Sequence, residues 1–132
     1  MIYGIGVDIV KISRIKKAIE RWESRFLKKV FTDEEIDFCK SRPKPINAFA
    51  LRFAAKEAFS KAIGLGMRKG IRWKDIEVFH YPTGKPALRL YGRSLQLCKE
   101  NHIDRIHISL SDEGDYGIAF VVLETEENRT YK

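Results

Sequence analysis

Asp8 is an acidic residue inside an otherwise apolar stretch at the start of the chain, a setting in which a carboxylate could bind a metal ion. The alternation of residues 1–10 predicts a strand with Gly4, Gly6 and Asp8 on one face. A carboxylate there is costly unless it is paired or metal-bound, and the glycines leave room for a ligand or a close backbone. The alternative is that Asp8 ends the strand and caps the next helix. Because apolar residues continue past it, we favour a functional carboxylate.

Glu57 is the second candidate, in an alanine-rich, proline-free stretch at residues 52–66 that predicts a helix. Glu57 and Lys61 lie one turn apart on the flank of its apolar stripe. Gly64 and Gly66 supply a helix stop, and a basic loop follows. Taken alone, this stretch favours an exposed ion pair worth about 0.3–0.5 kcal/mol, with the glycines as a C-cap. Whether Glu57 and Lys61 belong to an active site therefore depends on the other segments of the chain.

Composition limits the class of protein. The 132 residues suit one domain, which we place at residues 1–125, with a polar tail at 126–132. The net charge of +7 implies an anionic partner, which could be nucleic acid, a phosphate ligand, a membrane surface or an acidic protein. No apolar run reaches membrane-spanning length, and no secretory signal is seen. Cys39 and Cys98 lack metal-type spacing, so we expect free thiols and a cytoplasmic protein.

Further elements must position the two carboxylates. A capping box at Thr32–Glu35 opens a short helix, and Asn47 is expected to cap the central one. Two hairpins follow, separated by a short helix. The order of strand, three helices, hairpin, helix and hairpin predicts a single compact α+β domain with a mostly antiparallel sheet. The expected later elements are strands at 76–80 and 87–91, a helix at 94–100, and strands at 106–111 and 116–123.

The first helix is expected to run from Ser13, as its cap, to Lys28. Its inner stripe of Ile12, Ile15, Ile19, Trp22 and Phe26 should be buried. The rest of the helix carries a basic ridge, which in most proteins is only a solvated face. The ridge residues are Arg14, Lys17, Arg21, Arg25 and Lys28.

The strand at 106–111 places its apolar residues on one face and His107, Ser109 and Ser111 on the other. Such a polar face could contact phosphate oxygens. It could equally be an ordinary wet sheet face, and this alternative is stronger for the serines than for His107.

Four segments in register resemble the holo-[acyl-carrier-protein] synthase family, the small bacterial type of 4'-phosphopantetheinyl transferase. Each motif is weak alone, but the four together are specific and run in order over residues 1–124. The family usually has a second histidine directly after the Ser-x-Ser strand, where this chain has Asp112, so a role for that position is in doubt. The matching segments are Gly4–Val10 with Arg14-Ile15, Phe53–Gly64, Gly84–Pro86 and His107–Ser111.

The resemblance implies a reaction, the Mg²⁺-dependent transfer of 4'-phosphopantetheine from coenzyme A to a serine hydroxyl of apo acyl carrier protein. Adenosine 3',5'-bisphosphate is released, and the reaction supports fatty acid biosynthesis. The resemblance places Asp8 and Glu57 on the metal ion, a ligand set that Mg²⁺ accepts together with phosphates and waters. Glu57, or a water that it holds, takes the serine proton, and Lys61 offsets charge on the leaving group.

The resemblance also implies which residues bind coenzyme A and how the protein assembles. Larger relatives contain two such halves, and this chain corresponds to one of them. It should therefore form a homotrimer with sites at the subunit interfaces. The basic ridge should dock the acidic carrier protein. The residues expected to bind coenzyme A are Arg52, Lys61, Gly64, Gly66, Lys85, Pro86, His107 and Ser109.

Two other classes compete with this interpretation. A nucleic-acid-binding module would explain the net charge but not two carboxylates beside glycines in apolar elements. A non-catalytic interaction domain would explain the helices but not the four motifs together. We therefore expect an enzyme without nucleic-acid or membrane partners.

Overall fold

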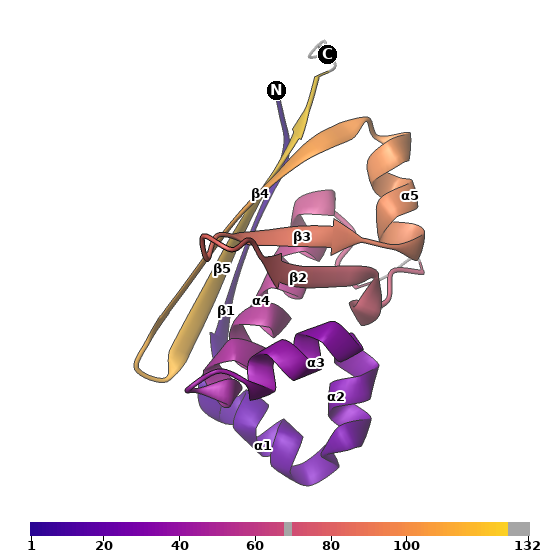
Figure 1. Cartoon of the computed structure of the whole chain (residues 1–132). Coiled ribbons are helices and arrows are strands. Elements are labelled where there is room, and N and C mark those ends of the chain that lie inside the picture. The colour runs from indigo at the N-terminus through magenta and orange to yellow at the C-terminus, as the bar shows by residue number, and fades with distance from the viewer. Residues whose placement is uncertain (68–69, 127–132) are drawn as a thin grey trace.

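A computed structural model describes residues 1–67 and 70–126 (Figure 1). It is a single α+β unit with antiparallel sheets, as the sequence predicted. Arg68 and Lys69 of the basic loop, and the polar tail beyond Glu126, lie outside the described residues. The elements are β1 (Ile2–Lys11), α1 (Ile12–Trp22), α2 (Ser24–Val30), α3 (Asp33–Lys40), α4 (Pro45–Ile63), the short η1 (Trp73–Asp75), β2 (Ile76–His80), β3 (Pro86–Leu90), α5 (Gly92–Glu100), β4 (Ile103–Glu113) and β5 (Tyr116–Thr125).

A three-stranded antiparallel sheet in the order β1-β5-β4 runs along the molecule, with the start of β1 and the end of β5 at one end (Figure 1). Helix α4 packs against the inner face of this sheet, and α1–α3 gather at the other end. The β2–β3 hairpin forms a separate two-stranded sheet beside α4. The central helix therefore contacts every layer, and side chains on its different flanks face different surroundings.

Gly4 and Gly6 serve a close backbone contact between β1 and α4. A Cβ atom at Gly6 would lie 1.8 Å from the carbonyl oxygen of Ala58, and one at Gly4 would lie 2.0 Å from that of Ala62. Neither position accepts a side chain without a shift of backbone. Of the two roles that the sequence allowed for these glycines, the structure supports close packing. This packing brings Asp8, two residues further along the same face, directly to α4.

The expected helix 13–28 is wrong as a single helix. It divides into α1 and α2 at Glu23, whose backbone has a left-handed φ of 48°. Ser13 is also not the cap, since Asp115 in the β4–β5 turn accepts hydrogen bonds from the Ser13 backbone N–H at 2.9 Å and hydroxyl at 2.6 Å. Trp22, expected to be buried, is 46% exposed at the break.

The α4 boundaries differ from the prediction at one end only. The helix begins at Pro45 with Lys44 as N-cap, so Asn47 lies inside the first turn and is not the cap. Its side-chain amide instead donates to Asp112 at 2.9 Å. The C-cap is Gly64 in the left-handed conformation, as predicted. The capping box of Thr32 and Glu35 on α3 is confirmed.

Strand β5 was expected to be buried, and only one of its faces is. Ala119, Val121 and Leu123 are fully buried against α4, whereas Ile118 and Phe120 are 40% and 43% exposed. The exposed face continues across β1, so the sheet presents one broad apolar surface to solvent. We call it the outer sheet face; its large apolar residues are Ile5, Val7, Ile9, Tyr116, Ile118 and Phe120.

A buried ion pair joins α3, α4 and β2. The ammonium of Lys56 lies 2.8 Å from the carboxylate of Glu35, and both side chains are fully buried. Lys56 also donates to the carbonyls of Trp73 and Ile76, and Glu35 accepts the backbone N–H of Val78 at 2.9 Å. The two charges are thus paired and hydrogen-bonded, as buried charges must be.

The two cysteines are free thiols, as expected, and both are buried. Burial raises the pKa of the Cys39 and Cys98 thiols to about 11, so both stay protonated at neutral pH. Within the described residues, no helix is both long and apolar enough to span a membrane.

Candidate functional site

Asp8, Glu57 and Lys61 meet where β1 crosses α4. The ammonium of Lys61 lies 2.9 Å from Asp8 Oδ1 and donates to the carbonyl of Val7 at 3.2 Å. The side chain of Asp8 is 16% exposed and that of Lys61 is 52% exposed. Glu57, one turn before Lys61, is half-buried on the same flank. Three residues from two elements that are far apart in sequence thus form one charged cluster at the surface.

The two carboxylates of this cluster repel one another. Burial raises the pKa of Glu57, the charge of Asp8 raises it further, and Lys61 opposes both effects. A positive charge placed between the carboxylates would relieve the repulsion. The described residues hold no group of three or more His, Cys, Asp or Glu side chains suited to a metal ion. Asp8 and Glu57 alone supply the one or two carboxylates with which Mg²⁺ binds when its other ligands are phosphates and waters.

Gly64 and Gly66 follow this cluster at the end of α4. Their N–H groups already donate to the helix, Gly64 to the carbonyl of Lys61 at 3.0 Å and Gly66 to that of Ser60 at 3.1 Å. The expected approach of these N–H groups to a phosphate is therefore not available in this conformation. A Cβ atom at Gly64 would meet nothing within 4 Å, so what this glycine offers is open space beside Lys61.

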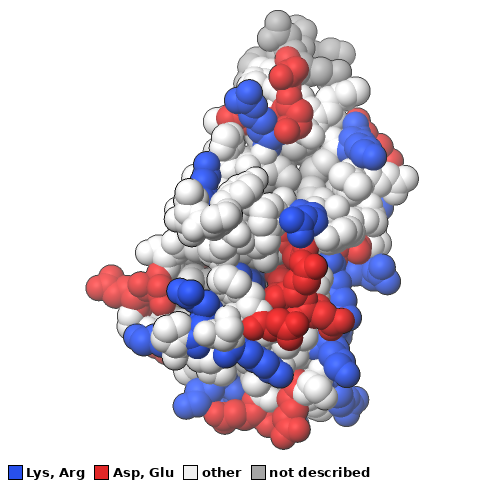
Figure 2. Space-filling view, in the orientation of Figure 1, with Lys and Arg blue, Asp and Glu red and all other residues white. Residues whose placement is uncertain are grey.

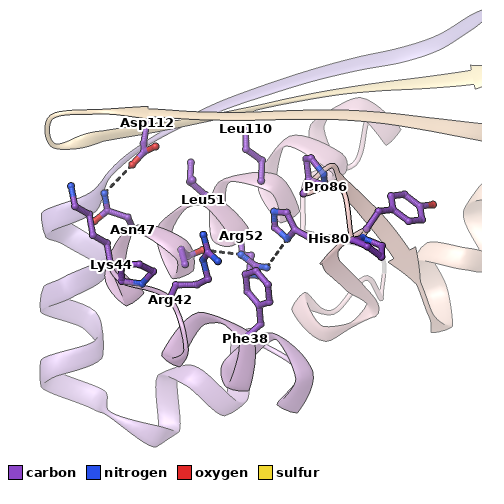
Figure 3. A pocket seen from close by; sticks show the side chains of 15 residues that line it. Phe38, Arg42, Lys44, Asn47, Leu51, Arg52, His80, Pro86, Leu110 and Asp112 are labelled. Atoms are coloured by element: carbon purple, nitrogen blue, oxygen red, sulfur yellow. Dashed lines mark hydrogen bonds between the residues drawn. The ribbon is translucent and has the colours of Figure 1, made fainter.

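A groove of about 720 Å³ lies on another flank of α4, between α3, the β2–β3 turn and β4 (Figure 3). Three cationic side chains line it, together with one carboxylate and the ring of Phe38. Pro86 of the predicted Gly-Lys-Pro segment is at its edge. The charged lining residues are Arg42, Lys44, Arg52 and Asp112.

Arg52 is the buried cation of this groove. It is 2% exposed, and its guanidinium lies 4.4 Å from the ring centre of Phe38 and 3.1 Å from Nδ1 of His80 (Figure 3). Its Nε is the one buried side-chain nitrogen or oxygen without a hydrogen-bond partner in the described part of the chain. Burial lowers the pKa of Arg52, because little water reaches its charge. A buried, incompletely paired guanidinium at the wall of a groove favours an anionic ligand.

The carboxylate cluster and the groove lie on opposite flanks of α4. Glu57 is five residues after Arg52, about 140° around the helix at 100° per residue. Asp8 comes from β1 at one edge of the sheet, while the groove takes residues from β4 at the other edge. The structure thus does not bring Arg52 and Pro86 together with Asp8, Glu57 and Lys61 within one chain.

The remaining predicted site residues lie elsewhere. Lys85 is exposed in the β2–β3 turn. His107 and Ser109 lie on the outer sheet face, where His107 Nε2 is 2.9 Å from Glu124 Oε1. The polar face of β4 predicted from the alternation is confirmed, and it points away from α4.

Sequence reasoning missed two contributors to the groove. His80 was assigned only to an alternating strand, and nothing in its spacing points to Arg52. The pairing of Asn47 with Asp112 was also missed, because it joins residues 65 positions apart. Asp112, noted as a departure from the family pattern, ties the β4–β5 hairpin to the start of α4.

The predicted basic ridge lies on α1 and α2, with Trp22 between its two parts. The guanidinium of Arg21 lies 4.9 Å from the Trp22 ring centre, and that of Arg25 lies 5.9 Å from it. Basic side chains gather over the helical end of the molecule, with acidic groups among them (Figure 2). The break after Trp22 bends the ridge without removing any of its five residues from solvent.

Comparison with known proteins places this geometry in context. A family model for the 4'-phosphopantetheinyl transferase superfamily matches residues 4–121. The holo-[acyl-carrier-protein] synthases of Halothermothrix orenii and Geobacter sulfurreducens are 49% and 44% identical to this chain over 124 residues, which cover 94% of it and 98% of each relative. The crystal structure of the Neisseria meningitidis holo-[acyl-carrier-protein] synthase is 42% identical, with a TM-score of 0.87 over 95% of this chain and 100% of that one. The Helicobacter pylori synthase in complex with coenzyme A is 32% identical, with a TM-score of 0.79 over 91% and 99% of the two chains.

Proposed function

This chain belongs to the holo-[acyl-carrier-protein] synthase family of the 4'-phosphopantetheinyl transferase superfamily, and from that premise we propose that it transfers 4'-phosphopantetheine from coenzyme A to a serine of apo acyl carrier protein. The observation that carries the proposal is the meeting of Asp8, Glu57 and Lys61 across the β1–α4 contact. Solved relatives with bound coenzyme A support the choice of donor. The by-product is adenosine 3',5'-bisphosphate, and the cellular role is fatty acid biosynthesis in the cytoplasm.

Asp8 and Glu57 would hold Mg²⁺, and each has a distinct neighbour. When bound, the ion supplies positive charge for the pyrophosphate of coenzyme A and relieves the repulsion between the carboxylates. Asp8 is kept in place by Lys61 at 2.9 Å. Glu57, or a water that it holds, accepts the proton of the serine hydroxyl.

The transfer exchanges one phosphorus–oxygen bond for another. The serine oxygen attacks the phosphorus atom that carries pantetheine, and the bond from that phosphorus to the oxygen of the adenosine bisphosphate breaks. Lys61, half-exposed beside Asp8, offsets the negative charge that remains on the leaving group. Gly64 leaves this side of the site open, since it adds no side chain there.

The groove beside Arg52 would hold a phosphate of the adenosine part of coenzyme A. Its volume of about 720 Å³ and its three cationic side chains suit a phosphorylated nucleoside. Pro86, the first residue of β3, lines this groove, and Lys85 precedes it in the β2–β3 turn.

The opposite placement of the groove and the carboxylate cluster supports a composite site. One coenzyme A molecule would reach both only if the groove belonged to a second copy of the chain. The outer sheet face, broad and apolar, is a surface on which such a copy could pack. We therefore propose a homotrimer, in which His107 and Ser109 of this face also come near the bound coenzyme A.

The basic ridge of α1 and α2 would dock the carrier protein, because acyl carrier proteins are acidic. Exposed charges of this kind speed encounter and fix orientation. Arg14 would lie nearest to the reaction because it follows β1, the strand that carries Asp8.

The decisive experiment is to incubate apo acyl carrier protein with the purified chain, coenzyme A and Mg²⁺, and to weigh the carrier protein by mass spectrometry. We expect the mass of one phosphopantetheine group to appear, and chelation of the metal to abolish the gain. Absence of any modification with several carrier proteins at saturating Mg²⁺ would refute the proposed activity.

A further inference from the structure

Arg52 needs a fixed orientation to act on a ligand, and the backbone gives it little help. Its NH1 group reaches the carbonyl of Ala48 only at 3.5 Å, and its Nε has no partner in the described chain. The short contact is the one from NH2 to Nδ1 of His80, at 3.1 Å. His80 is therefore the group best placed to hold the guanidinium.

The chemistry of the pair fixes the protonation state of His80. A guanidinium only donates hydrogen bonds, so Nδ1 of His80 must accept, and its proton must be on Nε2. A proton on Nδ1 as well would set two positive groups face to face. Burial lowers the pKa of His80, and the charges of Arg52 and Arg42 lower it further. The imidazole thus stays neutral and remains an acceptor.

The ring plane of His80 is fixed independently. It lies parallel to the ring of Phe38, with an interplanar angle of 3° and ring centres 5.0 Å apart. Phe38 also packs against the guanidinium of Arg52. A flat, uncharged acceptor that is held by stacking can orient the guanidinium of Arg52 and still leave its positive charge available to a ligand.

We propose that His80 is a positioning residue for coenzyme A binding, whose Nδ1 holds the guanidinium of Arg52 toward the groove. The inference rests on the proposed role of the groove and adds a residue that neither the sequence motifs nor the family resemblance pointed to. His80 itself need not touch the ligand. The other charged residues that line the groove, Lys44 and Asp112, lie at the end that is away from His80 (Figure 3).

Two variants separate the acceptor from the stacking. His80→Phe keeps a ring against Phe38 and removes the acceptor, whereas His80→Asn keeps an acceptor oxygen at the position of Nδ1. We expect His80→Phe to raise the KM for coenzyme A by about 10-fold, as for loss of a hydrogen bond to a charged group. The kcat and the KM for carrier protein should hardly change, and His80→Asn should restore most of the affinity. Calorimetry with adenosine 3',5'-bisphosphate should give the same order of affinities.

The double variant tests the pathway through Arg52. If His80 acts only through Arg52, then Arg52→Ala with His80→Phe should be no worse than Arg52→Ala alone. Additive effects would overturn the proposal, and so would a His80→Asn variant as defective as His80→Phe. An unchanged KM for coenzyme A in Arg52→Ala would overturn the groove assignment as well, which distinguishes that failure from failure of the His80 inference alone.

A measurement on the unmodified protein does not depend on whether the variants fold. The chain has three histidines, so the imidazole nitrogens of His80 can be assigned by ¹⁵N NMR. We expect the proton on Nε2 near neutral pH. A proton on Nδ1 would contradict the hydrogen bond to Arg52 and overturn the proposal whatever the variants do.

Discussion

At the scale of single residues, the proposed site consists of two carboxylates whose negative charges repel each other. Asp8 forms an ion pair with Lys61. Glu57 is half-buried, and its pKa is raised by burial and by the negative charge of Asp8. The ion pair with Lys61 is partly exposed, so it contributes little stability by itself. The arrangement is therefore consistent with the cation site proposed above, rather than with a role in stabilising the fold.

The first prediction concerns these carboxylates. Asp8→Asn and Glu57→Gln keep size and shape and remove one negative charge each. We expect each to lower kcat/KM by roughly 100-fold or more, the range seen when one electrostatic group of an active site is lost. Higher Mg²⁺ should restore part of the activity. Steady-state kinetics over a Mg²⁺ titration would measure this.

The matched control is Asp104→Asn, an exposed carboxylate on β4. It should leave both activity and Mg²⁺ dependence unchanged. Near-normal turnover of either site variant at ordinary Mg²⁺ would exclude the two-carboxylate site, and unchanged circular dichroism would show that any loss is not unfolding.

A second residue-scale prediction concerns Asp112, where the family usually has histidine. Asp112 is exposed and accepts the Asn47 amide at 2.9 Å, a contact that a histidine ring nitrogen could also accept. We therefore expect Asp112→His to change kcat and both KM values only a few-fold. A large gain in activity would instead show that the position matters and that this chain is a weakened or specialised member of its family.

At the scale of elements, the sequence predicted what local signals encode. The capping box of Thr32 and Glu35, the glycine stop of α4 and the two hairpins were all foreseeable. The break between α1 and α2 was not, because Ile19 and Phe26 both pack inward and keep the helical period on either side of Glu23. Partners distant in the chain were also hidden, as with Asp115 at the start of α1 and His80 beside Arg52.

The buried pair of Lys56 and Glu35 gives the third prediction. Lys56→Met should lower the free energy of unfolding by roughly 3–5 kcal/mol, because Glu35 would remain buried without its cation. The double variant Lys56→Met with Glu35→Gln should be more stable than Lys56→Met alone, since no unpaired charge remains and the new amide oxygen can still accept the N–H of Val78. Urea denaturation followed by circular dichroism measures both. Equal stability of the two variants would contradict the buried-charge explanation.

The fourth prediction concerns the basic ridge. Arg14→Glu or Arg21→Glu should raise the KM for carrier protein several-fold and leave that for coenzyme A nearly unchanged. Added salt should weaken the wild type in the same selective way, since exposed charges are screened over about 8 Å at physiological ionic strength.

Lys99→Glu is the matched control for the ridge, an exposed lysine on α5 far from α1 in the fold. It should affect neither substrate. Equal effects of the ridge variants on both substrates, or none on either, would mean that the ridge is only a solvated surface.

At the scale of the whole molecule, the groove and the carboxylate cluster face apart within the single chain. The groove with Arg52 and the cluster with Glu57 lie on opposite flanks of α4, and the outer sheet face exposes a row of large apolar side chains. From the sequence we expected site roles for the three residues of the cluster and, of the groove, for Arg52 and Pro86, but nothing in it pointed to His80. The sequence motifs could not predict that the cluster and the groove lie apart within one chain, because that depends on how α4 is turned against the sheet.

The last prediction tests whether a second copy joins them. Phe120 lies at the centre of the outer sheet face, paired with Val7 on one side and Ser109 on the other, so Phe120→Glu should place a charge in the proposed interface. We expect sedimentation to show monomers and activity to fall sharply while circular dichroism is unchanged. Leu95→Glu, at an apolar residue of α5 that is 38% exposed, should remain oligomeric and active. Mixing the weakened Glu57→Gln and Arg52→Ala chains at a coenzyme A concentration below KM should restore part of the activity, because a mixed assembly contains interfaces with an intact residue of each kind. A fully active monomer, or a mixture with no recovery although the subunits exchange, would place the complete site within one chain.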